Sequence, residues 1–278
     1  MATIGILHPG EMGSAVGALL VSSGHDVLWA SEGRSRETAA RAASARLRDV
    51  GTVDEIAEAS EIVFSICPPH AALELASGVA ALVFGGVFVD ANAVSPAAAA
   101  TIGSIVAMRG ATFVDGGIVG PPPGPGVETR LYLSGDDAAA VSRLFDGTQV
   151  SATVLAGPIG AASALKMTYA AWTKGTAALL LAVRAAARAH DVEDALLAEW
   201  AKSIPQLPAR SERAARSAVT KGWRWVGEME EIAATLADVA LPTGFHEAAA
   251  EVFRRSRNVD PTDADEIDRV LAALLGRG

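Results

Sequence analysis

The sequence has few of the residues that stabilise secreted or metal-binding proteins. It contains one cysteine, Cys67, so no disulfide can form within the chain. No group of cysteine and histidine residues has the spacing of metal ligands. We therefore expect no metal centre, and we expect the protein to work in a reducing compartment, the cytoplasm.

A basic excess and long apolar segments are also missing. The formal net charge of −9 opposes broad nucleic-acid binding, which requires a basic face. Lys174 and Arg184 interrupt the most apolar long stretch, residues 170–187, whereas a membrane span needs roughly 20 mostly apolar residues. The first residues, MATIGILHPGEMG, lack the pattern of a signal peptide. We expect no nucleic-acid or membrane partner, and a small molecule as the substrate.

Aromatic residues make up only 5% of the chain, although half of it is hydrophobic. Alanine, valine and leucine must therefore provide most of the core, and alanine favours helices. A length of 278 residues is compatible with one large or two modest domains.

Short β-branched segments alternate with stretches of helical pattern as far as residue 155. This alternation predicts an α/β fold, a Rossmann-type doubly wound sheet covered by helices on both faces. Strands are predicted at residues 3–7, 26–30, 62–66, 87–90, 112–115, 130–134 and 152–155, and helices at 12–23, 36–46, 70–79, 96–108 and 138–145.

From residue 161 onward only helical patterns follow. Helices are predicted at 161–190, 193–203, 210–221, 226–240, 244–257 and 263–274, with breaks at Pro205, Pro208, Gly222, Pro242 and Pro261. The sequence therefore predicts an α/β domain over residues 1–158 and an all-helical domain over residues 159–278.

The loop after the first strand has the features of a dinucleotide site. The Rossmann fingerprint is G-x-G-x-x-G, and Gly10 and Gly13 match its second and third glycines, with His8 in place of the first. The following helix offers its N–H groups and positive dipole end to phosphates. We predict cofactor contacts from His8, Pro9, Gly10, Glu11, Met12 and Gly13. The alternative is a plain strand–helix turn that binds nothing.

The residues after the second strand favour NADP over NAD. NADP enzymes place arginine and hydroxyl groups here for the 2′-phosphate, and Ser31, Arg34, Ser35 and Arg36 supply them. Glu32 is the acidic residue that favours NAD instead, so NAD stays possible. The alternative for Arg34 and Arg36 is an ordinary solvated helix start.

Cys67 and Pro68 follow the strand at 62–66, at the sheet edge where open α/β sheets bind ligands. We predict that their backbone lines the cofactor. Cys67 is interpreted as a small packing residue rather than a nucleophile. The stiff, proline-rich loop from Gly120 to Gly126 is predicted to shape the mouth of the substrate site.

Four motifs, the dinucleotide loop among them, follow one another along the chain. They are ILHPGEMG, VDANAVSP at 89–96, FVDGGIVG at 113–120, and GPIG at 157–160 leading to Lys166. In this the chain resembles the β-hydroxyacid dehydrogenase superfamily, which includes 6-phosphogluconate dehydrogenase, 3-hydroxyisobutyrate dehydrogenase and the imine reductases. The segment LPTGFHEAAAEVFRR resembles a subgroup with a poorly characterised C-terminal domain catalogued with phosphogluconate dehydrogenases.

The resemblance implies an NAD(P)-dependent dehydrogenase or reductase acting on a CH–OH group, with Lys166 as general acid/base. It places Asn92 near the nicotinamide ribose or the substrate, as a binding and catalytic residue. The alternative for Asn92 is an Asx turn that caps the helix at Pro96. The resemblance also implies a homodimer formed through the helical domain.

Two substrate-holding groups of the superfamily are absent. Its substrate loop typically reads D-A-P-V-S-G-G, and with its aspartate on Asp115 the serine that binds a substrate carboxylate falls on Val119 here. The paired glycines fall on Gly120 and Pro121, and the asparagine one turn after the lysine falls on Ala170. These departures place an ordinary short hydroxyacid in doubt, and also 6-phosphogluconate.

Lys166 has the surroundings that a proton-transfer residue needs. Its neighbours in GPIGAASALKMTYAAW are apolar, and lost solvation lowers a lysine pKa toward the working pH. The alternative is a surface lysine whose stem alone is buried. Tyr169, three residues on, is predicted either to orient the substrate and share proton transfer or to pack in the core.

The predicted substrate site comprises Val119, Gly120, Pro121, Lys166 and His246. His246 stands near a helix start, so capping or packing is its alternative role. Three functions follow: an NADP-dependent oxidoreductase of a small β-hydroxy acid or hydroxy amino acid, an imine reductase, or a non-catalytic NADP-binding sensor. Imine reductases usually lack this lysine, which favours the first.

Overall fold

The computed structural model describes residues 1–256 and 266–276. The chain divides into two compact units, Met1–Met167 and Thr168–Gly278. The division lies inside helix α7 (Ala161–Ala189), whereas the change from strands to helices falls at the start of that helix. The first turns of α7 therefore belong to the α/β unit.

The described part of the first unit contains one sheet of eight strands, in the order β3-β2-β1-β4-β5-β6-β7-β8. All neighbouring pairs are parallel except β6 and β7. The α/β prediction is therefore confirmed. The strands are β1 (Thr3–Ile6), β2 (Asp26–Trp29), β3 (Arg48–Asp49), β4 (Ile62–Ser65), β5 (Val87–Asp90), β6 (Thr112–Val119), β7 (Thr129–Ser134) and β8 (Val150–Val154).

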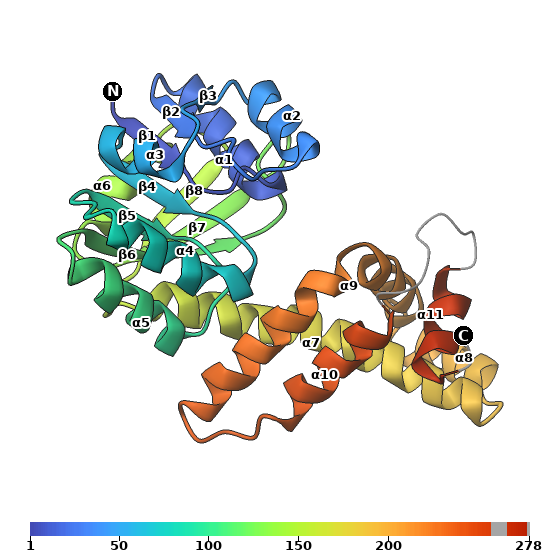
Figure 1. The fold of residues 1–278 in the computed structure, drawn as a ribbon. Helices are drawn as coiled ribbons and strands as arrows, with labels where there is room; N and C mark the ends of the chain where they lie inside the picture. The colour runs from blue at the N-terminus through green and yellow to red at the C-terminus, as the bar shows by residue number, and fades with distance from the viewer. Residues whose placement is uncertain (257–265, 277–278) are drawn as a thin grey trace. The chain divides into compact units, whose positions relative to one another are not determined.

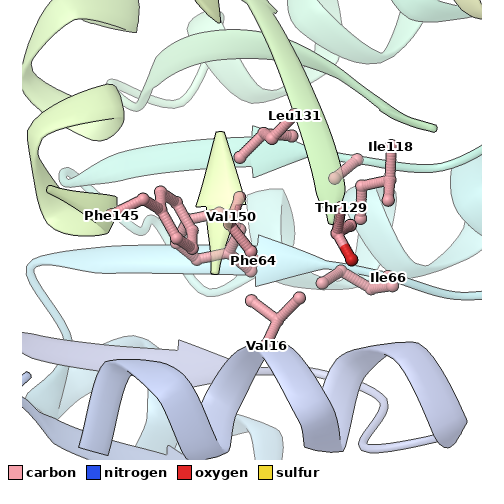
Figure 2. A pocket seen from close by; sticks show the side chains of 9 residues that line it. Val16, Phe64, Ile66, Ile118, Thr129, Leu131, Phe145 and Val150 are labelled. Carbon is pink, nitrogen blue, oxygen red and sulfur yellow. The ribbon is translucent and has the colours of Figure 1, made fainter. Parts of the chain in front are cut away.

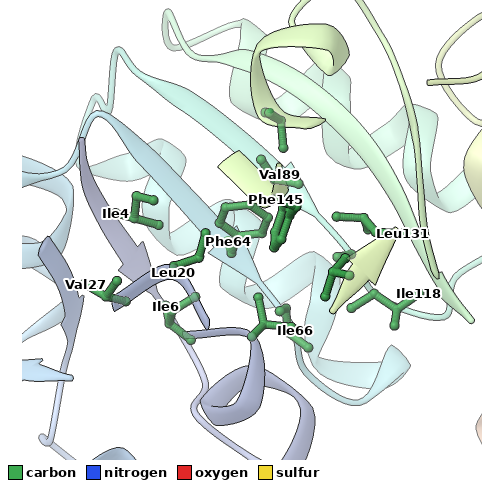
Figure 3. Packing of buried hydrophobic residues seen from close by; sticks show 14 of the residues in the cluster. Ile4, Ile6, Leu20, Val27, Phe64, Ile66, Val89, Ile118, Leu131 and Phe145 are labelled. Carbon is green, nitrogen blue, oxygen red and sulfur yellow. The ribbon is translucent and has the colours of Figure 1, made fainter. Parts of the chain in front are cut away.

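Helices cover both faces of the sheet (Figure 1). One apolar cluster joins the sheet to α1, α2 and α6, and Figure 3 shows Phe64 of β4 and Phe145 at its centre. A second cluster joins the other face to α3, α4 and α5. These helices are α1 (Glu11–Ser22), α2 (Arg36–Ser44), α3 (Val53–Ala59), α4 (Pro69–Ala81), α5 (Pro96–Ala107) and α6 (Ala138–Ser142), with a 3₁₀ turn η1 (Arg143–Phe145).

The sequence pattern did not predict β3 and α3. β3 has two exposed residues, and α3 is a short charged helix that buries only Ile56. Periodicity is therefore weak in both. A usable signal was present, because Thr52 and Glu55 form the reciprocal capping box that marks a helix start.

The second unit is helical in its described part, and none of the described helices has the length and apolar character to span a membrane. Besides α7 it contains α8 (Glu193–Ser203), α9 (Leu207–Ala237), α10 (Gly244–Ser256) and α11 (Glu266–Leu274). Parts of three predictions lie outside the described residues. They are the end of the predicted helix 244–257, the break at Pro261, and the first residues of the predicted helix 263–274.

The predicted break at Gly222 is wrong, because α9 runs through it as a single helix. A Cβ on Gly222 would stand 3.6 Å from the carbonyl oxygen of Phe253 and 3.7 Å from the Ser256 hydroxyl, both on α10. A glycine inside a helix costs about 1 kcal/mol. These distances are ordinary van der Waals contacts, so the packing of α9 against α10, rather than a requirement for glycine, offsets that cost.

Candidate active site

The strand order places the ligand edge of the sheet between β1 and β4. At this point the chain leaves neighbouring parallel strands toward opposite faces, which opens a crevice at their carboxyl ends. His8 and Gly10 follow β1, and Cys67 and Pro68 follow β4. The predicted cofactor residues from the two loops therefore share one edge.

Gly13 and Gly10 have different tasks in the β1–α1 loop. A Cβ on Gly13 would stand 2.3 Å from the carbonyl oxygen of His8, so only glycine lets α1 start this close to β1. A Cβ on Gly10 would meet only the His8 ring, at 3.4 Å. Packing within the protein thus requires Gly13, whereas the space over Gly10 is open to a ligand.

Helix α1 begins without a side-chain cap. Gly10 is its N-cap residue, and the Ser14 hydroxyl donates back to the Gly10 carbonyl at 2.6 Å. The first N–H groups of a helix lack partners within the helix, and they carry its positive dipole end. The donors and the open space over Gly10 fit the pyrophosphate of a dinucleotide.

Arg34 reaches back from the β2–α2 loop to this site. Its guanidinium donates to the carbonyl of Leu7 at 2.9 Å and lies 3.2 Å from Nδ1 of His8. Ser35 caps α2 by accepting the Thr38 N–H, while Glu32 and Arg36 are exposed. Ser31 is half-buried, and its backbone carbonyl accepts the backbone N–H of Arg34 in the turn.

Asn92 is buried, and its amide joins the ends of β4 and β5. Its oxygen accepts the Cys67 N–H at 2.5 Å, and its nitrogen donates to the Ser65 hydroxyl at 2.9 Å and to Asp90. Ser95, not Asn92, caps α5. The amide thus orders the backbone of Cys67 beside the cofactor edge, and direct contact of Asn92 with a ligand stays a prediction.

The Cys67 thiol is poorly suited to nucleophilic chemistry. Burial, followed by the nearby Asp90, raises the pKa of the Cys67 thiol to about 12. A thiol with that pKa is protonated at neutral pH, and the thiolate is the nucleophile. The geometry therefore supports the interpretation of Cys67 as a packing residue.

Two buried carboxyl groups that the sequence patterns did not single out lie side by side. Asp90 is the last residue of β5, and Asp115 lies opposite it within β6. The Asp115 carboxylate accepts three N–H groups at the start of α7, from Gly160, Ala162 and Ser163, at 2.9 to 3.1 Å. This carboxylate therefore fixes the first turn of α7 to the sheet.

Asp90 has a different environment. Its Oδ1 accepts from Asn92, whereas Oδ2 is buried with no hydrogen-bond partner in the described residues. Burial raises the pKa of Asp90 to about 7, and the neighbouring Asp115 adds to the increase. The signal in the sequence was a carboxylate at the end of each of two neighbouring strands.

Lys166 lies on the part of α7 that Asp115 fixes. A Cβ on Gly117 of β6 would stand 3.0 Å from the Cβ of Lys166, so the base of the lysine side chain lies against the sheet backbone there. Gly117 lies two residues past Asp115, the partner of the last residue of β5. Lys166 therefore starts from the carboxyl edge of the sheet, half-buried.

The predicted substrate loop connects β6 to β7. Val119 is buried at the end of β6, and Gly120 has a φ of +115°, which favours glycine. The Pro121 carbonyl accepts the hydroxyl of Thr129 at 2.7 Å, which anchors the loop to β7. Val119, Gly120 and Pro121 therefore provide backbone groups where the superfamily loop provides a serine hydroxyl.

The small cavity in Figure 2 lies under this sheet, between α1 and the strands. Phe64, Leu131 and Phe145 contribute to its wall, and the one hydroxyl there, from Thr129, is bonded to Pro121. The cavity is a gap in the core packing and offers a substrate no polar group to bind.

Tyr169 and His246 belong to the second unit. Tyr169 is 47% exposed. His246 packs against Gly175 of α7 and lies 3.4 Å from the carbonyl of Ala171, an arrangement typical of a packing residue. Ala170, at the position of the superfamily asparagine, is buried.

Lys174, the second lysine of α7, pairs with the buried Glu228 of α9, and its ammonium lies 5.7 Å from the centre of the Trp225 ring. Among the described residues, no cluster of three or more histidine, cysteine, aspartate or glutamate residues is arranged to hold a metal ion.

An open parallel sheet with an uncapped, glycine-lined helix start at its switch point defines a dinucleotide-binding protein. The family profile for the NAD binding domain of 6-phosphogluconate dehydrogenase matches residues 2–146, and a domain of unknown function, DUF1932, matches residues 187–256. Because the first match covers more than half of the chain, the protein belongs to the 6-phosphogluconate dehydrogenase-like β-hydroxyacid dehydrogenase superfamily. The expected resemblance is confirmed.

Solved structures agree with this fold. A conserved protein of unknown function, described as similar to 3-hydroxyacid dehydrogenases, has 25% identity over 99% of both chains and a TM-score of 0.69. The 3-hydroxyisobutyrate dehydrogenase of Mycobacterium tuberculosis, solved with L-serine, has 16% identity over 99% of both chains and a TM-score of 0.75. An imine reductase of Streptomyces aurantiacus has 21% identity over 97% of this chain and 99% of its own, with a TM-score of 0.55. No curated protein sequence matches significantly.

The protein is therefore an NAD(P)-binding oxidoreductase of this superfamily.

Proposed function

We propose that the protein is an NADP-dependent oxidoreductase that interconverts a small β-hydroxy acid or hydroxy amino acid with its carbonyl compound, using Lys166 as general acid/base. The observation that carries the proposal is the position of Lys166. Its Cβ lies against Gly117 at the carboxyl edge of the sheet, and the start of its helix is fixed by the Asp115 carboxylate.

Lys166 handles the proton of the reaction. When the substrate is oxidised, the neutral amine accepts the hydroxyl proton as the adjacent carbon loses hydride. When a carbonyl is reduced, the ammonium returns that proton to the oxygen. The bound nicotinamide supplies the hydride chemistry, and the protein supplies position and the proton.

The choice of NADP is supported by the charges at the β2–α2 loop. Arg34 brings a guanidinium to this loop, and both Arg34 and Arg41 of α2 lie near enough to affect His8 electrostatically. Glu32, the residue that would favour NAD, is exposed. We expect the dissociation constant for NADPH to be lower than that for NADH.

The test is turnover of a substrate panel followed by absorbance of the reduced nicotinamide. Lys166→Met should reduce kcat by two orders of magnitude or more and leave NADPH affinity within about twofold. Lys174→Met is the control for loss of a lysine on the same helix. Its kcat per folded molecule should equal that of wild type, although loss of the Glu228 ion pair lowers the fraction that folds. Equal kcat for wild type and Lys166→Met would contradict the lysine mechanism.

Imine reduction is the second candidate, because neither Val119 nor Gly120 has a hydroxyl to hold a substrate carboxylate. Cyclic imines therefore belong in the same panel. Faster NADPH oxidation with imines than with any oxo acid, in wild type and in Lys166→Met alike, would replace the first proposal. Tight NADPH binding without any turnover would indicate a sensor.

We further propose a homodimer formed through the helical unit. Trp172, Leu179 and Val183 on α7 are 68%, 59% and 37% exposed. Their spacings of seven and four residues place them on one face of the helix. A stripe of large apolar side chains in contact with water is unfavourable, and a second copy of this chain would cover it.

A further inference from the structure

His8 is the residue by which this loop departs from the dinucleotide fingerprint. The first glycine of that fingerprint normally permits a tight turn. Here the turn forms with a histidine, and the Gly10 N–H donates to the His8 carbonyl at 2.8 Å. The imidazole is half-buried at the carboxyl end of β1. The site thus contains a ring with two nitrogens that a glycine would not provide.

Arg34 decides which nitrogen of this ring can donate. Nη1 of Arg34 lies 3.2 Å from Nδ1 of His8, and Nη2 is held by the Leu7 carbonyl at 2.9 Å. A guanidinium has donors only, so Nδ1 must accept this hydrogen bond. The proton of the neutral imidazole is therefore on Nε2.

Burial and the surrounding positive charge favour the neutral ring. Burial, and then the positive charges of Arg34 and Arg41, lower the pKa of His8 below its ordinary value. At neutral pH the ring is then a fixed donor at Nε2 and a fixed acceptor at Nδ1. A protonated ring would direct an N–H at the guanidinium of Arg34 and lose that hydrogen bond.

The Nε2 side of the ring lies beside the helix start. A Cβ placed on Gly10 would stand 3.4 Å from Cδ2 and 3.5 Å from Nε2 of His8. Gly10 is the N-cap of α1, so the ring borders the same open space as the first N–H groups of the helix. A phosphate oxygen in that space has a donor on each side.

We propose that His8, held as the Nε2–H tautomer by Arg34, donates a hydrogen bond from Nε2 to the pyrophosphate of the bound dinucleotide. His8 thereby replaces a turn-forming glycine with a phosphate-binding residue, and Arg34 acts through His8 as well as through its own charge. This inference rests on the dinucleotide binding in the proposed function, but it requires neither Lys166 nor a particular substrate.

The first test measures the tautomer directly. Long-range ¹H–¹⁵N NMR spectra of ¹⁵N-labelled protein without cofactor should show His8 protonated at Nε2 only. In Arg34→Met the two neutral tautomers should exchange, because the donor to Nδ1 is gone. A wild-type His8 protonated at Nδ1, or charged at pH 7, would overturn the proposal.

The second test separates the pyrophosphate from the 2′-phosphate. Calorimetric titration of His8→Met with NADPH and with NADH should show both dissociation constants raised by the same factor, roughly tenfold. His8→Gln, whose amide can still donate, should recover part of the loss. His25→Met is the control, because His25 lies before β2 and bonds to the Ala2 N–H. It should bind both nucleotides as wild type does.

The remaining outcomes contradict different statements. A loss confined to NADPH would assign His8 to the 2′-phosphate and overturn the inference. Unchanged affinity in His8→Met, with wild type binding normally, would also overturn it and leave the proposed function intact. A wild-type protein that binds neither nucleotide at millimolar concentration would instead overturn the proposed function.

Discussion

Ser163 donates both its backbone N–H and its hydroxyl to the carboxylate of Asp115, at 3.1 and 2.6 Å. Ser134 and the N–H groups of Gly160 and Ala162 share the same carboxylate. A side chain of β6 thus acts as the anionic cap of α7, whose positive end attracts it. The position of the first turns of α7, and so that of Lys166, depends on this contact.

Asp115→Asn should destabilise the protein by roughly 3 kcal/mol or more, because buried donors lose a charged acceptor. Ser163→Ala removes one of the hydroxyl donors and should cost about 1–2 kcal/mol. Denaturant unfolding measures both, with Ser22→Ala, an exposed helix hydroxyl, as the control within about 0.5 kcal/mol. If Asp115→Asn were as stable as wild type, the carboxylate would not be what fixes α7.

Asp90 should make stability fall as pH rises. Its pKa is raised to about 7 in the folded protein, above the ordinary value of 3.8 for an exposed carboxyl. Between these values the folded state holds a proton that the unfolded state has lost, so the stabilisation is complete below the lower value. It is lost toward pH 7 at up to about 1.4 kcal/mol per pH unit.

Asp90→Asn removes this dependence, because an amide does not titrate. The difference in unfolding free energy between wild type and Asp90→Asn, measured in urea from pH 4.5 to 8, should shift in favour of the variant up to about pH 7 and then level off. Parallel curves for the two proteins would show that Asp90 ionises in the folded state at its ordinary pKa.

Gly13→Ala and Gly10→Ala should separate folding from cofactor binding. The new methyl group at residue 13 meets the His8 carbonyl at 2.3 Å, so we expect a loss of roughly 1–3 kcal/mol and a lower Tm. The methyl group at residue 10 fits against the His8 ring but occupies the space over the helix start. Gly10→Ala should therefore keep its Tm and bind NADPH at least tenfold more weakly, and the reverse pattern would contradict the assigned roles.

Disrupting the apolar stripe on α7 should separate the dimer. Light scattering should give wild type a mass about twice the 28.4 kDa of one chain, and Trp172→Glu with Leu179→Glu a mass near 28.4 kDa. Leu73→Glu, an exposed apolar position on α4, is the matched control and should stay dimeric. A monomeric wild type at micromolar concentration would refute the dimer.

Local patterns in the sequence determined much of this protein. Alternating β-branched and helical segments determined the α/β class, because strand and helix periods are properties of neighbouring residues. Gly10 and Gly13 indicated the dinucleotide loop, because the spacing of these glycines is also a property of neighbouring residues. The run of α9 through Gly222 could not be predicted, because the packing of Phe253 that offsets the glycine lies on another helix.

Only the tertiary structure decided how the site is held together. The cap on α7 comes from Asp115, and the ring of His8 receives its tautomer from Arg34, both far away in sequence. Which donor meets which acceptor depends on strand order and register, and these are set by the packing of the whole sheet. The sequence by itself therefore determined the kind of site, and the fold decided which atoms can act in it.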